Sequence, residues 1–139
     1  MTRRNIAGIA TAVAVLGCSA AAAADMPKDE YDASVAGIAA EYQADRQKCG
    51  ERHGNVADLC IARARGAQRV SRAELEAAYR PSPKANLAAA NARARSAYEI
   101  AIEECDDRKR DARSGCVKDA KAARERAKAE ALARAGAPR

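Results

Sequence analysis

The chain contains no tryptophan and no phenylalanine, and His53 is its single histidine. Its aromatic residues are four tyrosines. Leucine, isoleucine and valine number twelve among the 115 residues that follow position 24, about a tenth, whereas folded domains usually exceed about 20%. A large apolar core is therefore excluded. The chain is instead rich in alanine, glutamate, lysine and arginine, which are strong helix formers, so we expect an all-α fold.

The same shortages argue against several classes of function. One histidine offers no pair of nucleophile and base, and a zinc site would require closely spaced cysteines together with histidines. There is no aromatic platform on which nucleic-acid bases could stack. An acidic run at residues 103–107 would act in catalysis only in a desolvated pocket, and we interpret it as a solvated helix end. We therefore predict no catalytic residue, no metal, no cofactor and no nucleic-acid partner, and hence no enzyme.

Residues 1–24 are typical of a signal peptide. Arg3 and Arg4 precede an uncharged apolar stretch, residues 6–17, which is shorter than the roughly 20 residues that span a bilayer. Small residues at Ala22 and Ala24 suit cleavage by signal peptidase. We predict a periplasmic or secreted protein that begins at position 25 and has no transmembrane segment in its mature chain.

A second cleavage site leaves an alternative open. Residues 15–18 (VLGC) resemble a lipobox, in which Cys18 would be acylated and would anchor a lipoprotein to the membrane. Either route removes Cys18 from the pool of thiols. Four cysteines remain, and an even number in an exported chain favours disulfides.

The mature chain contains an internal duplication with a shift of 56 residues. Cys49 and Cys60 are eleven residues apart, as are Cys105 and Cys116. The same shift matches further residues in both copies, namely Tyr42 with Tyr98, Arg52 with Arg108, Ala64 with Ala120, and Glu74 with Glu130. We predict a first helical hairpin over residues 25–80, a linker at 81–83 and a second hairpin over 84–139.

Helix boundaries follow from proline, glycine and capping residues. Pro27 suits the first turn of the first helix, and Ser82 with Pro83 suits the start of the third. Glycines at positions 50 and 54 end the first helix, and Asn55 is the expected N-cap of the second, which runs to about position 79. Asp111 is its counterpart before the fourth helix, with Ser114 as a rival cap. We expect four helices, the fourth ending near position 135.

The spacing of the cysteines predicts a disulfide within each hairpin. The first cysteine of each pair ends one helix and the second lies in the first turn of the next, so the two face each other across the loop. Four cysteines allow three connectivities, and the duplication favours Cys49–Cys60 with Cys105–Cys116. A loop of this size contributes about 3 kcal/mol to stability in the chain-entropy model, a large share where the core is thin.

The excess of positive charge lies in the C-terminal part. Residues 117–139 contain seven basic and three acidic residues, and the segment between positions 25 and 116 is neutral. One interpretation is a helix that binds anionic envelope surfaces through Lys118, Lys121, Arg124, Arg126 and Lys128. The other is a solvated helix with ion pairs between positions four apart, such as Lys121–Glu125, Arg126–Glu130 and Glu130–Arg134.

Several motifs together resemble a family of small secreted proteins of Gram-negative bacteria. They are residues 26–31 (MPKDEY), 42–45 (YQAD), 54–60 (GNVADLC), 79–84 (YRPSPK), 105–107 (CDD) and 116–123 (CVKDAKAA). Members of the family are often labelled TolA-like or cell-envelope-biogenesis proteins, and the resemblance implies no catalytic residue. Residues 110–115 depart from the pattern because they lack its Gly-Asn pair, so we expect a different turn there.

These observations lead to two functional hypotheses. The first is a non-catalytic periplasmic or cell-envelope protein that acts as a structural or protein-binding component, with Tyr31, Tyr42 and Tyr98 either anchoring the core or facing a partner. The alternative is a peripheral module that binds anionic envelope surfaces through the basic C-terminal helix.

Overall fold

The computed structural model describes residues 26–136, which form four helices: α1 (Lys28–Gly50), α2 (Asn55–Tyr79), α3 (Pro83–Asp106) and α4 (Arg110–Gly136). The predicted all-α architecture of two hairpins is confirmed. The predicted signal peptide and Cys18 lie outside the described residues. Within residues 26–136, no helix is both long and apolar enough to cross a bilayer.

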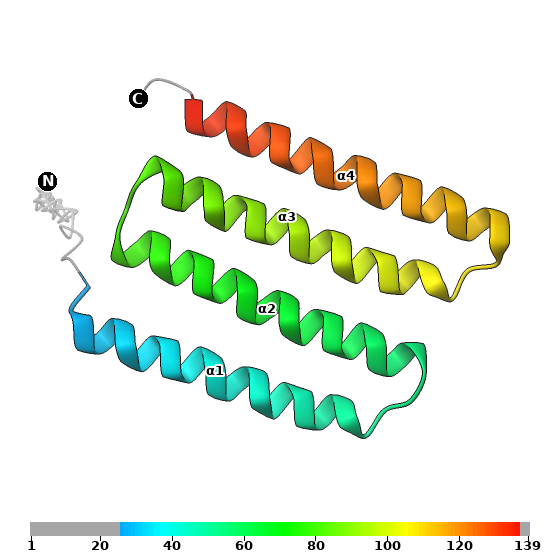
Figure 1. Ribbon diagram of the computed structural model, residues 1–139, viewed down its shortest axis with the longest axis horizontal. Coiled ribbons are helices and arrows are strands. Elements are labelled where there is room, and N and C mark those ends of the chain that lie inside the picture. The colour runs from blue at the N-terminus through cyan, green and yellow to red at the C-terminus, as the bar shows by residue number, and fades with distance from the viewer. Residues whose placement is uncertain (1–25, 137–139) are drawn as a thin grey trace, which may run out of the picture.

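The four helices lie side by side in a single layer, and each runs antiparallel to the next (Figure 1). Contacts join α1 to α2, α2 to α3 and α3 to α4, and within residues 26–136 no other pair of helices is in contact. The chain therefore forms a flat array rather than a closed bundle. Helices α1 and α4 are its two edges, and each packs on one side only.

Side-chain capping explains where α3 begins. The Ser82 hydroxyl accepts a hydrogen bond from the Ala85 amide at 3.0 Å, and Pro83 is the first helical residue, as predicted. The connection between the hairpins is therefore residues 80–82. Pro27, which we expected in the first turn of α1, is instead its N-cap residue, so the helix begins one residue later, at Lys28.

The prediction that Asn55 caps α2 is wrong. Gly54 occupies the N-cap position with φ of 59° and ψ of −150°, a conformation that side chains disfavour and glycine adopts freely. Asn55 is the first helical residue, and its side-chain amide donates a hydrogen bond to the Glu103 carbonyl on α3 at 3.0 Å. The amide thus links two hairpins instead of closing a helix end.

The turn of the second hairpin differs from that of the first, as the missing Gly-Asn pair predicts. Arg110 stands where the first copy has Gly54, and α4 begins at this residue, so Asp111 lies in its first turn and Ser114 lies inside the helix. The loops nevertheless begin alike. The Arg52 amide donates to the Cys49 carbonyl and the Arg108 amide to the Cys105 carbonyl, both at 3.0 Å.

The fully buried residues among residues 26–136 are all small. They are Cys49, Ala64, Gly66, Ala89, Ala94, Ser96, Cys105, Ala120 and Ala131. Among residues 26–136, no leucine, isoleucine or valine is fully buried. Alanine contacts allow neighbouring helices to approach closely but remove little apolar area from water. The thin core that the composition predicts is therefore spread along the three lines of contact.

Each hairpin contains the predicted disulfide. Cys49 is bonded to Cys60, with Cα atoms 5.5 Å apart, and Cys105 is bonded to Cys116, with Cα atoms 5.7 Å apart. The second cysteine of each pair lies in the second turn of its helix rather than the first, since α2 and α4 begin five and six residues earlier. Both disulfides join the hairpins near their turns.

Helices α2 and α3 join the two hairpins without a disulfide. A Cβ added to Gly66 would lie 3.2 Å from the Ser96 Cβ, so the helices are in tight contact here. The buried Ser96 hydroxyl donates to the Gly66 carbonyl at 3.2 Å and accepts from Arg69 at 3.3 Å. This arrangement satisfies the one polar side chain buried in the interface.

Three ion pairs flank this close contact: Arg63–Glu104 at 3.0 Å, Arg69–Glu99 at 2.7 Å and Arg93–Glu74 at 2.6 Å. Burial alone would raise the pKa of Glu99, but hydrogen bonds from Arg95 and Arg69 outweigh this effect and hold the pKa below its ordinary value. The carboxylate is therefore the favoured form in the folded protein, and it couples α3 to α2.

Candidate binding surfaces

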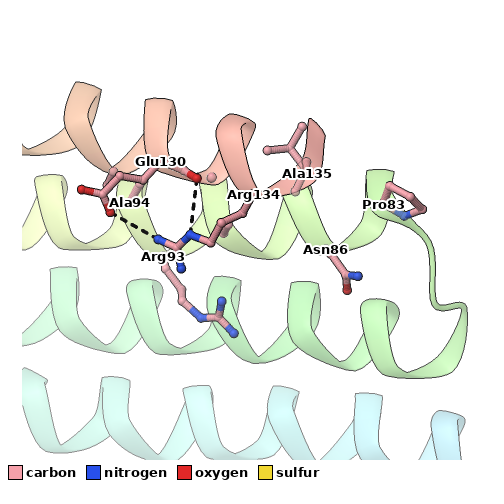
Figure 2. Close-up of a pocket in the computed structure, with 11 residues that line it drawn as sticks. Pro83, Asn86, Arg93, Ala94, Glu130, Arg134 and Ala135 are labelled. Atoms are coloured by element: carbon pink, nitrogen blue, oxygen red, sulfur yellow. Dashed lines mark hydrogen bonds and ion pairs between the residues drawn. The ribbon is translucent and has the colours of Figure 1, made fainter. Parts of the chain in front are cut away.

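A groove of about 470 Å³ lies between α3 and α4 at the open end of the second hairpin, far from its disulfide (Figure 2). Five of its eleven lining residues are alanines from both helices: Ala90, Ala94, Ala127, Ala131 and Ala135. Leu87 supplies the largest apolar side chain in the lining. The groove is open to solvent along its length and is therefore a surface feature rather than an enclosed cavity.

The duplication explains why this groove exists. Subtracting 56 from Leu87, Ala94, Ala131 and Ala135 gives Tyr31, Ile38, Leu75 and Tyr79 in the first hairpin. The four large side chains of the first hairpin thus correspond to one leucine and three alanines in the second hairpin.

In the first hairpin, the Tyr31 and Tyr79 rings stack with centroids 4.2 Å apart and fill the space between the helices. The Tyr31 hydroxyl also donates to Glu76 at 3.0 Å, which raises the pKa of Tyr31 above its ordinary value. The open end of the first hairpin is thus closed by its own side chains, whereas that of the second is not.

Polar groups border the groove. Arg134 forms an ion pair with Glu130 at 3.2 Å within α4, and Arg93 extends from α3 toward α2 (Figure 2). There Arg93 pairs with Glu74 of α2. Leu132 of the second hairpin stands at the position that corresponds to Glu76 of the first, and it is 58% exposed. An apolar floor with charged groups at its border is typical of a surface that binds another molecule.

The five basic residues proposed for anionic surfaces fall into two groups. The Arg124 guanidinium lies over the Tyr98 ring, 4.4 Å from its centroid, and also pairs with Glu125, as does Lys128. Hydrogen bonds from Lys128 and Arg124 hold the pKa of Glu125 below its ordinary value. Both cations are thus held by groups of their own molecule.

Lys118, Lys121 and Arg126 are exposed on α4 and take part in none of the ion pairs found among residues 26–136. Of the three predicted pairs four residues apart, Glu130–Arg134 is present. Glu125 binds Arg124 and Lys128 rather than Lys121. The structure thus separates the basic set into cations that stabilise the second hairpin and cations that point to solvent.

The tyrosines are half-buried and lie within the hairpins rather than between them. Tyr31 packs against Tyr79, and Tyr98 packs under Arg124. Tyr42 lies beside Gln68, which is the counterpart of Arg124, in a small hollow between α1 and α2. The tyrosine positions therefore anchor each hairpin.

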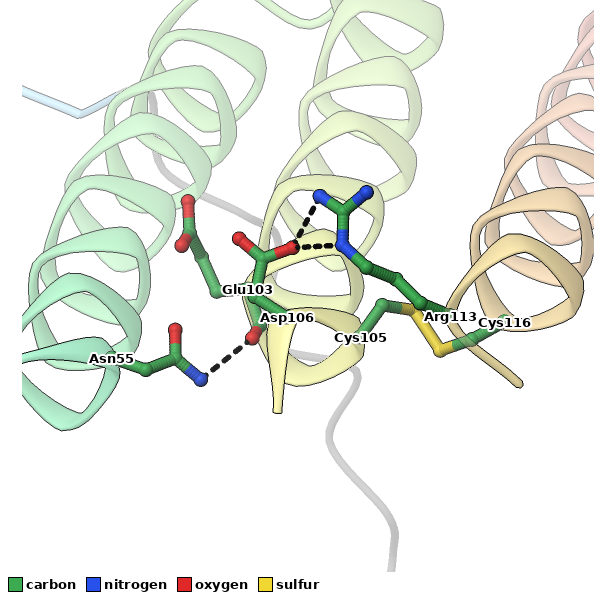
Figure 3. Close-up of a disulfide and its surroundings, with 6 residues drawn as sticks. All are labelled: Asn55, Glu103, Cys105, Asp106, Arg113 and Cys116. Carbon is green, nitrogen blue, oxygen red and sulfur yellow. Dashed lines mark hydrogen bonds and ion pairs between the residues drawn. A yellow bond between two sulfur atoms is a disulfide. The ribbon is translucent and has the colours of Figure 1, made fainter. Parts of the chain in front are cut away.

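The acidic run at the end of α3 does not form a cluster of carboxylates. Asp106 binds Arg113 of α4 at 2.6 Å next to the Cys105–Cys116 disulfide, and the Asn55 amide reaches the Glu103 carbonyl from the opposite side (Figure 3). Glu104 binds Arg63 of α2. The run thus ties α3 to both neighbouring helices. Among residues 26–136, no three His, Cys, Asp or Glu side chains are arranged to hold a metal ion.

Comparison of the chain with family models, with curated proteins and with solved structures found no match. The groove was not predicted from the sequence. The signal was available in the duplication, since aligning the two copies shows isoleucine replaced by alanine at position 94 of α3, and leucine and tyrosine replaced by alanine at positions 131 and 135 of α4.

Proposed function

We propose that the protein is a non-catalytic component of the bacterial cell envelope that binds another protein through the groove between α3 and α4. The observation that carries this proposal is the replacement of three large side chains of the first hairpin, Ile38, Leu75 and Tyr79, by alanine in the second. A partner segment that presents aromatic or aliphatic side chains would restore the packing that Tyr31 and Tyr79 provide in the first hairpin.

The envelope location is supported by the two disulfides, which persist in oxidising compartments outside the cytoplasm. The sequence features of residues 1–24 and the resemblance to TolA-like secreted proteins support the periplasm in particular. The lipoprotein form anchored through Cys18 remains the alternative. A structural or binding role is consistent with an array whose hairpins are held by covalent bonds rather than by a core.

Site-specific photo-crosslinking tests the groove. A photoreactive residue in place of Ala90, inside the groove, should link the protein to one defined envelope protein, whereas the same residue at exposed Ala97 on α3 should not. The double variant Ala94→Ile, Ala131→Leu restores two of the large side chains of the first hairpin, those of Ile38 and Leu75, and should fill the floor of the groove. It should abolish the link while the protein keeps its helical content. Equal crosslinking at Ala90 and Ala97 would refute the proposal.

A second candidate is binding to anionic envelope surfaces through α4. The observation that favours it is charge: α4 has eight basic and four acidic residues, whereas α1 has three basic and five acidic residues. Replacing Lys118, Lys121 and Arg126 by glutamine should weaken binding to anionic vesicles and mimic added salt, since exposed charges are screened over about 8–10 Å. Replacing Arg124 and Lys128 should have less effect, because these cations are already paired. Vesicle binding that survives all five changes would exclude this function.

A further inference from the structure

The interface between α2 and α3 shows how the second helix of one repeat packs against the first helix of the next. It combines the close Gly66–Ser96 contact with three flanking ion pairs. In a duplicated chain, α1 corresponds to α3 and α4 corresponds to α2. One molecule therefore carries at its two edges the two helix types that pack together at its centre.

Both edges are open. The α1 edge consists of the residues that correspond to the α2-facing side of α3: Ala33, Ala36, Ala40, Gln43, Ala44 and Gln47. The α4 edge consists of the residues that correspond to the α3-facing side of α2: Lys118, Ala122, Glu125, Arg126, Ala129 and Ala133. All twelve are exposed, and no other helix of residues 26–136 covers them.

We propose that α4 of one molecule packs against α1 of a second molecule in the way that α2 packs against α3, so that copies associate head to tail and extend the layer. The direction of the chain allows this, because α4 and α1 would be antiparallel, as α2 and α3 are (Figure 1). The contact joins two different surfaces, so each added copy leaves one α1 edge and one α4 edge free.

The shape of the edges fits this contact. The positions of Gly66 and Ser96, where the internal helices are in tight contact, correspond to Ala122 and Ala40. A pair of alanines has about the same bulk as glycine facing serine and buries no hydroxyl group. The close approach is therefore available at this pair of positions, with the longer Lys118 and Arg126 on either side of it where α2 has Ala62 and Val70.

Charge complementarity also fits. The Arg63–Glu104 pair corresponds to Asp119 and Lys48, so an opposite-charge pair is kept with its signs exchanged. Lys48 also pairs with Asp45 of its own helix at 2.9 Å, so the two carboxylates would share this cation. Ala78 and Asn86, which border one hollow between α2 and α3, correspond to Arg134 and Glu30. A second opposite-charge pair would thus form where the internal interface has none.

The net charges of the two helices are also complementary, since α1 has a net charge of −2 and α4 has a net charge of +4. Two internal ion pairs are not reproduced: Arg69–Glu99 corresponds to Glu125 and Gln43, and Arg93–Glu74 to Gly37 and Glu130. We therefore expect a reversible association that depends on concentration and weakens with salt.

Sedimentation of the oxidised protein over a range of concentrations tests the proposal. The wild type should form dimers and longer species as its concentration rises. Lys48→Glu should weaken association at least about fivefold, because it places two carboxylates opposite each other. The double variant Lys48→Glu, Asp119→Lys should restore association, since the pair is rebuilt with exchanged signs. Lys109→Glu, in the turn between α3 and α4, changes the net charge equally and should have no effect.

A second pair of variants tests shape without charge. Ala40→Gln and Ala122→Gln keep a good helix former at an exposed site but prevent close approach, so each should abolish association. Ala97→Gln, on an exposed part of α3, is the matched control.

Carbodiimide coupling in a mixture of ¹⁴N- and ¹⁵N-labelled protein should join Lys48 to Asp119 between chains, because α1 and α4 make no contact within one molecule. A protein that stays monomeric at millimolar concentration would overturn the proposal. So would a symmetric dimer with α1 coupled to α1, or association unchanged by Lys48→Glu. None of these outcomes depends on the groove between α3 and α4.

Discussion

The contacts inside the two hairpins and the contact between the hairpins are made in different ways. Inside each hairpin a disulfide closes one end, and in the first hairpin stacked tyrosines close the other. Between the hairpins, α2 and α3 meet through a glycine, a buried serine and three ion pairs. Covalent bonds tolerate imprecise packing, whereas the central interface relies on close approach and charge. We expect the two kinds of contact to respond differently to reduction, bulk, truncation and pH.

Removal of a disulfide should have the largest effect. We expect the double variant Cys105→Ser, Cys116→Ser to lose about 3 kcal/mol of unfolding free energy, and α4 to lose protection from hydrogen exchange first. The variant Cys49→Ser, Cys60→Ser should release α1 less completely, because the tyrosine stack still holds the open end. Denaturant unfolding and segment-resolved hydrogen exchange measure both effects. Equal protection of α4 with and without its disulfide would contradict this view.

A larger side chain at Gly66 should disrupt the interface between the hairpins. We expect Gly66→Leu to cost about 1–3 kcal/mol, because the new side chain meets Ser96 and Ile100 across the interface. Gly37→Leu is the control, since an added Cβ there has no neighbour within 4 Å. This control should be neutral or stabilising because leucine favours helix. Thermal unfolding followed by circular dichroism distinguishes the two, and equal melting temperatures would argue against a tight contact.

Truncation of Tyr31 should affect the first hairpin alone. We expect Tyr31→Ala to cost about 1–2 kcal/mol through the lost ring stacking and the lost hydrogen bond to Glu76. Tyr31→Phe should cost only the hydrogen bond. The equivalent change in the second hairpin, Leu87→Ala, should cost less, because Leu87 borders a groove that is already open. A larger loss for Leu87→Ala would show that the groove is packed in solution.

Acid should weaken the contact between the hairpins slightly. The pKa of Glu99 is lowered in the folded protein from its ordinary value of 4.5, so its contribution is present above that pH and is lost as pH falls through the lower folded pKa. The pair is about a third exposed, so we expect less than about 1 kcal/mol. Unfolding measured from pH 6 to pH 3 should show this loss, and Glu99→Gln should remove that part of the pH dependence.

The helices and the disulfides could be predicted because they depend on local patterns. Serine followed by proline at positions 82 and 83 starts a helix whatever lies around it, and paired cysteines eleven residues apart bracket each turn. Asn55 shows where such reasoning fails. Asparagine is a good capping residue, but a glycine at position 54 can adopt the N-cap conformation itself, and α3 offers the Asn55 amide a carbonyl. The non-enzymatic function and the envelope partner remain predictions.

The sequence by itself determined the helical content, the duplication and the pairing of the cysteines, since each follows from residue type and spacing along one stretch of chain. Tertiary structure alone decided that the four helices form an open layer. It also showed that the alanines of the second copy, which are visible in the sequence, leave a groove between α3 and α4. Two disulfide-bonded hairpins could also pack face to face, because each disulfide acts within one hairpin and leaves the placement of one hairpin relative to the other undetermined. That placement depends on how closely α2 and α3 approach at Gly66 and Ser96, which is set by the summed bulk and charge of two facing helices.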